Sequence, residues 1–245
     1  MKLFLTSSVG GSYKENGRRI PCALTNENHF LDHLKKYWIN NSKCLLISSE
    51  PDNEEMSNSF ITVFSEAFKI SKLSLSEMDV CDRRNENDIA EFLYNYDLIL
   101  LTGGHVPTEN QFFNRIHLKE LLRSYKGIII GFSAGTMNCA DVVYAQPELA
   151  GEATNLTYKK YLDGLNLTGI NILPHFQEIK EQTLDGLRIL EDISIPDSKI
   201  RPFYALVDGS YIYAENNKSM LYGEAYWIHE GIITKICETD KYIQL

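Results

Sequence analysis

The sequence has 245 residues, 44% of them hydrophobic and 23% charged, so the chain can bury a full core, and we expect residues 1–245 to form a single domain. The formal net charge of −9 gives no electrostatic reason to expect nucleic acid or an anionic membrane as a partner. The cysteines are scattered and include no Cys-x-x-Cys pair, so the sequence predicts neither a disulfide framework nor a metal site, and we expect no cofactor.

The N-terminus and the apolar runs bear on where the protein works. The opening MKLFLTSSVGG has too short an apolar segment for the core of a signal peptide. No apolar run approaches the roughly 18 residues that a membrane helix needs. We therefore expect a cytoplasmic protein, and its oligomeric state, monomer or homodimer, stays open.

Short apolar runs alternate with segments of helical periodicity along the first part of the chain. Apolar runs that end in Gly, Ser or Thr predict buried strands at 2–8, 44–50, 72–78, 97–104 and 127–135. Segments that begin with Asn or acidic residues and repeat apolar side chains every three or four positions predict helices at 53–70, 85–96 and 109–125. This alternation predicts a doubly wound α/β domain, with a mostly parallel sheet and helices on both faces.

The last third of the chain has a different pattern. Residues 169–176 (GINILPHF) predict one more strand, and 177–194 predict a helix. Residues 201–238 predict short strands, with turns at Asp208-Gly209 and Glu230-Gly231. We expect this C-terminal part to be short and rich in β-structure.

Three of the predicted strands end in residues suited to chemistry, and ligands of an open parallel sheet bind beyond such strand ends. Ser133 lies in GIIIGFSAG, where flanking small residues permit the sharp strand-to-helix turn of a nucleophile elbow, although they could equally serve a simple turn. His175 alone among the histidines closes a predicted strand, so it can face Ser133 as a general base. The pair Gly103-Gly104 lets a backbone amide approach a substrate and form, with the amide of Ala134, an oxyanion hole.

The stretches LLTGGH, IIIGFSAGTMNCA and INILPHF, in this order, resemble signature stretches of the peptidase E (aspartyl dipeptidase) family of serine peptidases, to which cyanophycinases are related. The resemblance covers most of the chain and implies a fold similar to class I glutamine amidotransferases, with serine in place of cysteine. It implies hydrolysis of short peptides, in particular dipeptides with N-terminal aspartate, through a Ser-His-acid triad and an acyl-enzyme. Ser133 is then the nucleophile, His175 the base, and the amides of Gly104 and Ala134 the oxyanion donors.

The acid of this triad has two candidates. The family's aspartate falls at Glu148, in YAQPELAGE, which is the first choice, and Asp208, in YALVDGSYI, is the second. The family's Gly-Asn is replaced by Gly104-His105, so His105 either lines the mouth of the substrate pocket or is an exposed loop residue. Recognition of an aspartyl carboxylate needs a cation or amide donors, and no motif identifies that group here.

Two other functions fit parts of the pattern. An esterase of the α/β-hydrolase type shares Gly-x-Ser-x-Gly, but His175 follows Ser133 too closely for the further strands of that fold. The second alternative is a binding module that keeps the amidotransferase-like fold without catalysis. Against it, no member of the proposed triad is missing from the sequence.

Overall fold

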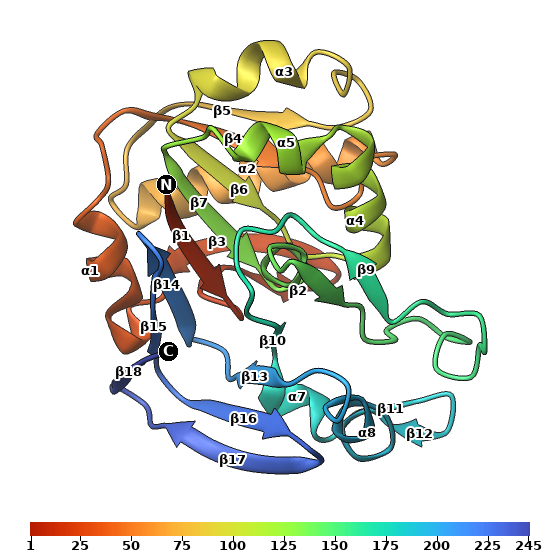
Figure 1. Ribbon diagram of the computed structural model, residues 1–245. Coiled ribbons are helices and arrows are strands. Elements are labelled where there is room, and N and C mark those ends of the chain that lie inside the picture. Colours follow the sequence, from red (N-terminus) through yellow and green to blue (C-terminus); the bar gives the residue numbers. More distant parts are fainter.

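The computed structural model describes residues 1–245, and an eight-stranded central sheet organises the fold (Figure 1). Its strand order is β18-β15-β14-β1-β7-β6-β4-β5. The strands are β1 (Lys2–Thr6), β4 (Ser42–Ile47), β5 (Leu75–Cys81), β6 (Leu98–Leu101), β7 (Ile128–Phe132), β14 (Tyr211–Glu215), β15 (Lys218–Tyr222) and β18 (Tyr242–Gln244). Strands β1, β7, β6, β4 and β5 run parallel, whereas β14, β15 and β18 extend the sheet with antiparallel pairings.

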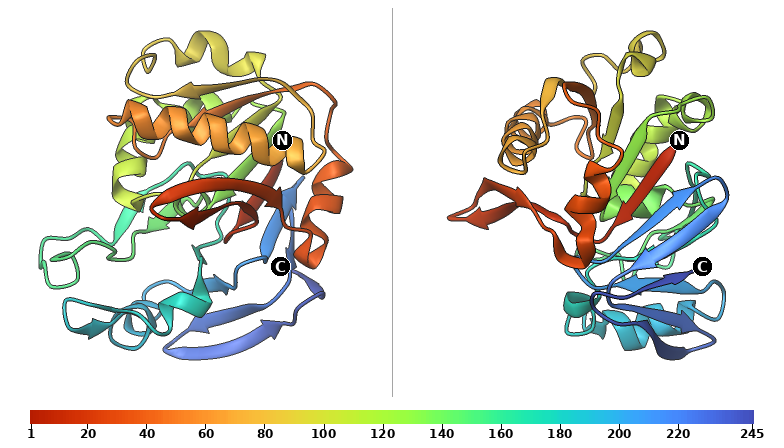
Figure 2. Two further views of the ribbon diagram at one scale, coloured as in Figure 1. Left: turned by 180° about the vertical axis from the view of Figure 1, so that it is seen from behind. Right: turned by 90° about the vertical axis from the view of Figure 1, so that its left-hand side faces the viewer.

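Side chains alternate between the two faces of this sheet, as a strand buried on both sides requires. Phe4 of β1 packs in one hydrophobic cluster with helices α1 (Phe30–Lys35) and α2 (Glu54–Ile70). Its neighbours Leu3 and Leu5 belong to a second cluster with α4 (Val106–Arg115) and α5 (Leu118–Leu122). Figure 2 shows α2 lying along the back of the sheet. Apolar cores therefore lie on both faces.

A second, four-stranded sheet lies below the central one in Figure 1. It consists of β10 (Ile172–Leu173), β13 (Phe203–Leu206), β16 (Ala225–His229) and β17 (Ile232–Cys237). Three hairpins pair β2 (Gly10–Glu15) with β3 (Arg18–Leu24), β8 (Val142–Tyr144) with β9 (Tyr161–Asp163), and β11 (Thr183–Leu184) with β12 (Leu187–Arg188). The remaining helices are short: α3 (Ile89–Phe92), α6 (Ala134–Asn138), α7 (Phe176–Ile179), α8 (Ile195–Asp197), the 3₁₀ turns Glu27–His29 and Leu93–Asn95, and a π-helical segment Ile189–Ser194. Every helix falls short of what a membrane span requires in length and apolar character.

The structure confirms a mixed α/β fold with a large, mostly parallel central sheet and corrects several of the predicted elements. The helix predicted at 177–194 is wrong. The chain there forms α7, the β11–β12 hairpin and the π-helical segment, because Asp185 and Gly186 both adopt positive φ at a tight turn. The helix predicted at 109–125 is divided into α4 and α5 at His117, whose φ is 52°. The hairpin of β2 and β3, which projects from the body in Figure 2, was not predicted.

Candidate active site

Ser133 occupies a sharp turn between β7 and α6, with φ 48° and ψ −111°. Such backbone strain in a non-glycine residue is typical of a nucleophile elbow. Its two flanking glycines are required by close packing: a Cβ at Gly131 would come 2.9 Å from Cα of Thr136, and one at Gly135 would collide with the Leu101 carbonyl. The local sequence therefore permits the elbow, and the Ser133 hydroxyl is presented at the end of the parallel strands.

His175 and Asp208 complete a chain of hydrogen bonds that begins at Ser133. Nε2 of His175 lies 2.9 Å from Oγ of Ser133, and Nδ1 lies 2.8 Å from Oδ1 of Asp208. Because a carboxylate can only accept, Nδ1 carries a proton and donates it. In the neutral ring Nε2 is then an acceptor for the Ser133 hydroxyl, which is the arrangement that a general base needs.

Ser7 supports this chain, although no sequence motif indicates it. Its hydroxyl accepts a hydrogen bond from the His175 amide at 2.8 Å and donates one to Oδ1 of Asp208 at 2.6 Å. Ser7 directly follows β1. Strand β1 pairs in parallel with β7, and Thr6 lies opposite Phe132, so Ser7 and Ser133 both follow at the same end of the two strands. Like Ser133 and His175, Ser7 lies at the end of a predicted strand. That position could have marked it as a candidate site residue.

The pKa values of His175 and Asp208 both shift in the direction that favours a charged pair. Burial lowers the pKa of His175, but the hydrogen bond and charge of Asp208 outweigh burial, so the net shift is upward from 6.5. Burial raises the pKa of Asp208, but the hydrogen bonds from His175 and Ser7, with the His175 charge, lower it overall. The two shifts favour an ionised Asp208 beside a His175 ring that is more basic than a free imidazole.

Glu148, the first choice for the acid, lines the cleft without bonding to His175. No hydrogen bond or ion pair joins its carboxylate to His175, whose Nδ1 is occupied by Asp208. The reason is topological: Asp208 lies in the crossover from β13 to β14, and β14 pairs with β1, which brings the crossover to Ser7 and His175. Glu148 nevertheless lines the same cleft, where burial and then the charge of Glu152 raise its pKa to about 7.

The predicted oxyanion donors are both available. Gly104, which follows β6, lines a cleft with Ser133 and His175. The amides of Gly104 and Ala134 donate no hydrogen bond within the protein, although the next amide, of Gly135, donates to the Thr102 carbonyl at 3.0 Å. Ala134 directly follows Ser133, and Gly104 lines the same cleft, so both free amides are candidates for the donors of an oxyanion hole.

His105, a candidate substrate-binding residue in the sequence, does not line the cleft. Its Nε2 lies 2.9 Å from Oε1 of Glu152, and its Nδ1 lies 2.8 Å from the Thr108 hydroxyl. Oε2 of Glu152 in turn accepts hydrogen bonds from the amides of Glu148 and Leu149, each at 2.9 Å. His105 thus holds the segment that carries Glu148.

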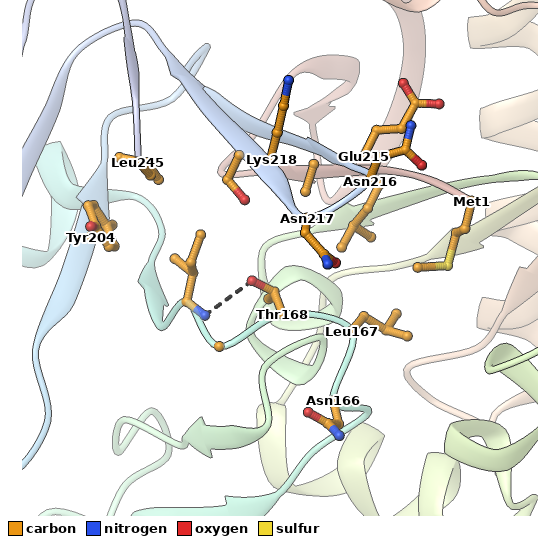
Figure 3. A pocket seen from close by; sticks show the side chains of 15 residues that line it. Met1, Asn166, Leu167, Thr168, Tyr204, Glu215, Asn216, Asn217, Lys218 and Leu245 are labelled. Carbon is orange, nitrogen blue, oxygen red and sulfur yellow. Dashed lines mark hydrogen bonds between the residues drawn. The ribbon is translucent and has the colours of Figure 1, made fainter.

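The cleft at Ser133 has a volume of about 230 Å³, smaller than the roughly 300–1,000 Å³ typical of sites for drug-sized ligands. A larger pocket of about 570 Å³ lies between the β14–β15 hairpin and residues 166–170 (Figure 3). The side chains drawn there, including Asn217, Lys218 and Thr168, do not include the Ser133–His175 pair. The small cleft is therefore the candidate active site.

Comparison with known proteins identifies the family. The model of "Peptidase family S51" matches residues 22–222, which include Ser133, His175 and Asp208. The chain belongs to peptidase family S51. It is accordingly a hydrolase of the serine peptidase class, with peptides as substrates. The esterase and binding-module alternatives have no support from this assignment.

Two solved structures of similar fold are distant from this chain in sequence. A peptidase from an acI-B1 Actinobacterium superposes with a TM-score of 0.66 at 15% identity, covering 100% of this chain and 96% of that one. A putative peptidase E protein from Listeria monocytogenes EGD-e gives 0.57 at 18% identity, covering 96% and 98%. No curated protein matches the sequence.

Proposed function

We propose that this S51 peptidase hydrolyses short peptides through a triad of Ser133, His175 and Asp208. The observation that carries the proposal is the continuous hydrogen-bond chain from the Ser133 hydroxyl through both ring nitrogens of His175 to Asp208. We further propose that the helices on the two faces of the sheet make it doubly wound, and that residues 1–245 act as one catalytic unit.

In this mechanism His175 takes the proton of Ser133 while Oγ bonds to the carbonyl carbon of the scissile peptide. The carbonyl oxygen becomes an oxyanion, which the amides of Gly104 and Ala134 stabilise, a contribution worth about 10² to 10³ in rate per donor. His175 then protonates the leaving amine, which departs as the C–N bond breaks. Water, deprotonated by the same ring, hydrolyses the acyl-enzyme and restores Ser133.

The small cleft supports short peptides as substrates. N-terminal aspartate, which the resemblance to peptidase E implies, would need a cation or amide donors in that cleft. No lysine or arginine lines it, and the side-chain amides of Gln146 and Gln182 share it with the carboxylates of Glu148 and Glu178. Aspartyl dipeptides therefore enter the test as one substrate among several.

Replacing Ser133 by Ala tests the mechanism directly. We expect the variant to fold, to lose covalent labelling by a fluorophosphonate, and to lose peptide hydrolysis down to the residual level that binding alone provides. A chelator is expected to leave the wild-type rate unchanged. Undiminished hydrolysis by the variant would show that Ser133 is not the nucleophile.

A further inference from the structure

The catalytic cleft contains polar groups that the proposed triad does not use. Glu148 lies on the segment after β8, and Glu178 lies in α7, three residues beyond His175. Both carboxylates line the same cleft as Ser133, and both exert a charge effect on His175. The cleft that holds Ser133 thus carries two carboxylates that the triad does not use.

The position of Glu148 is fixed by the fold. Glu152 accepts hydrogen bonds from the amides of Glu148 and Leu149 and is itself bonded to His105 at the start of α4. Glu148 keeps an exposed surface, but the packing around its carboxylate raises its pKa to about 7 and so disfavours the charged form. A cation placed beside it would restore the charged form and bind favourably.

Gln146 provides an independent observation in the same cleft. The residue is only 4% exposed, and its side-chain Oε1 is buried with no hydrogen-bond partner. Its carboxamide donates no hydrogen bond within the protein either. Buried acceptors without partners are rare because they cost free energy, and an N–H group of a bound ligand would satisfy this one.

We propose that Glu148, Glu178 and Gln146 form a subsite for an ammonium group of the substrate, which would make N-terminal aspartate a poor substrate. An ammonium has three donors and a positive charge, which match two carboxylates and an amide oxygen. An aspartyl carboxylate at the same place would be repelled by the two glutamates. This inference rests on the proposed function, because it assumes that the scissile bond lies at Ser133.

The ammonium could be the α-amino group of the first residue or the side chain of a lysine, and the substrates can distinguish them. We would measure kcat and KM for Ala-Ala, Lys-Ala and Asp-Ala and for their N-acetylated forms. N-acetylation of Ala-Ala is expected to lower kcat/KM by about 10- to 10²-fold if the α-amino group is bound. If the lysine side chain is bound, Lys-Ala exceeds Ala-Ala by a similar factor and keeps that advantage when acetylated.

The variants Glu148→Gln and Glu178→Gln test the residues. Each should raise KM for the preferred free peptide by about tenfold, change kcat much less, and reduce the discrimination against Asp-Ala. Glu181→Gln removes the same charge from an exposed position that does not line the cleft, and serves as the matched control. Should either variant fail to fold, the wild-type substrate series still decides.

Asp-Ala as the best substrate, or equal cleavage of all free and acetylated peptides, would overturn the subsite. Fluorophosphonate labelling of the wild type but not of Ser133→Ala reports on the nucleophile without any peptide. Labelling that persists while the substrate series fails would therefore refute the subsite and leave the proposed function standing. Labelling of both proteins would refute the proposed function itself.

Discussion

Asp208 is held in place before any substrate binds. Its carboxylate accepts from Ser7 and His175, and its amide donates to the Gln177 side chain at 3.1 Å. A carboxylate fixed in this way keeps the proton on Nδ1 of His175, so the other ring nitrogen faces Ser133 as an acceptor. In the proposed triad, the energetic role of the acid is therefore to select a tautomer and to stabilise the imidazolium that forms in the transition state.

Replacing Asp208 by Asn should lower kcat far more than replacing Glu148 by Gln. The equivalent change in the best-studied serine triad costs about 10⁴ in kcat because the amide favours the wrong tautomer, and we expect the same order here. Glu148→Gln should act mainly on KM. Steady-state kinetics of the two variants decide the matter, and a near-normal kcat for Asp208→Asn would exclude Asp208 as the acid.

The pH dependence of the reaction should follow His175. The ring must be neutral to accept the proton, and its pKa is raised, so activity is lost as the pH falls through a value above 6.5. The negative charges of Asp208, Glu178 and Glu148 all raise the pKa of this ring. In Asp208→Asn burial remains without the strongest of these partners, so the midpoint should move to lower pH.

An N-acetylated ester is the suitable substrate for this pH profile, since it lacks the ammonium group and so separates His175 from Glu148. Its kcat/KM would be followed from pH 5 to 9 for the wild type and for Asp208→Asn. A midpoint that moves upward in the variant would contradict the assignment of Asp208 as the partner of His175.

At the scale of elements, the elbow depends on how closely α6 approaches β6. The amide of Gly135, in the first turn of α6, donates a hydrogen bond to the carbonyl of Thr102, which directly follows β6. A side chain at Gly135 would collide with the Leu101 carbonyl, which belongs to a buried strand and has no room to move. Because Gly135 has no side chain, α6 can approach β6 closely enough to form the turn at Ser133.

Gly135→Ala should therefore lower the free energy of unfolding by about 1–3 kcal/mol, the typical cost of overpacking. Gly169→Ala is the matched control, because a Cβ there would meet no atom within 4 Å and the backbone φ is not positive. That variant should stay within about 0.5 kcal/mol of the wild type. Urea unfolding measures both, and equal stabilities would show that the approach of α6 to β6 is not tight.

The elements that local pattern could predict are those whose apolar runs are continuous. Strands β1, β4, β6 and β7 were predicted because each is a buried run ending in small or polar residues. Ser133 and His175 could be placed together because both follow such strands. Asp208 ranked second because its position depends on the pairing of β14 with β1, a contact between distant parts of the chain that no local pattern records. The predicted helix at 177–194 overlooked the turn signal of Asp185-Gly186.

For the molecule as a whole, the candidate triad joins the two sheets. Ser7 and Ser133 follow β1 and β7 of the central sheet, whereas His175 and Asp208 follow β10 and β13 of the second sheet. Catalytic geometry therefore depends on how the second sheet packs, even though the nucleophile does not belong to it. A displacement of about 1 Å between reacting groups can cost 10² in rate.

A matched pair of core substitutions tests this dependence. Phe203 lies in β13, fully buried against Tyr144 with ring centroids 4.3 Å apart, five residues before Asp208. Phe68 is equally buried in α2, on the far side of the central sheet from the second sheet's core. Phe203→Leu and Phe68→Leu should each cost about 1–2 kcal/mol of stability by leaving a small cavity.

Assayed well below both melting temperatures, Phe203→Leu should lose about tenfold or more in kcat/KM, because β13 positions Asp208. Phe68→Leu should retain the wild-type value within about twofold, since the strand ends that carry Ser7 and Ser133 are fixed by their own pairing. Parallel losses of activity in the two variants would show that general destabilisation, rather than the placement of the second sheet, controls the geometry at Ser133.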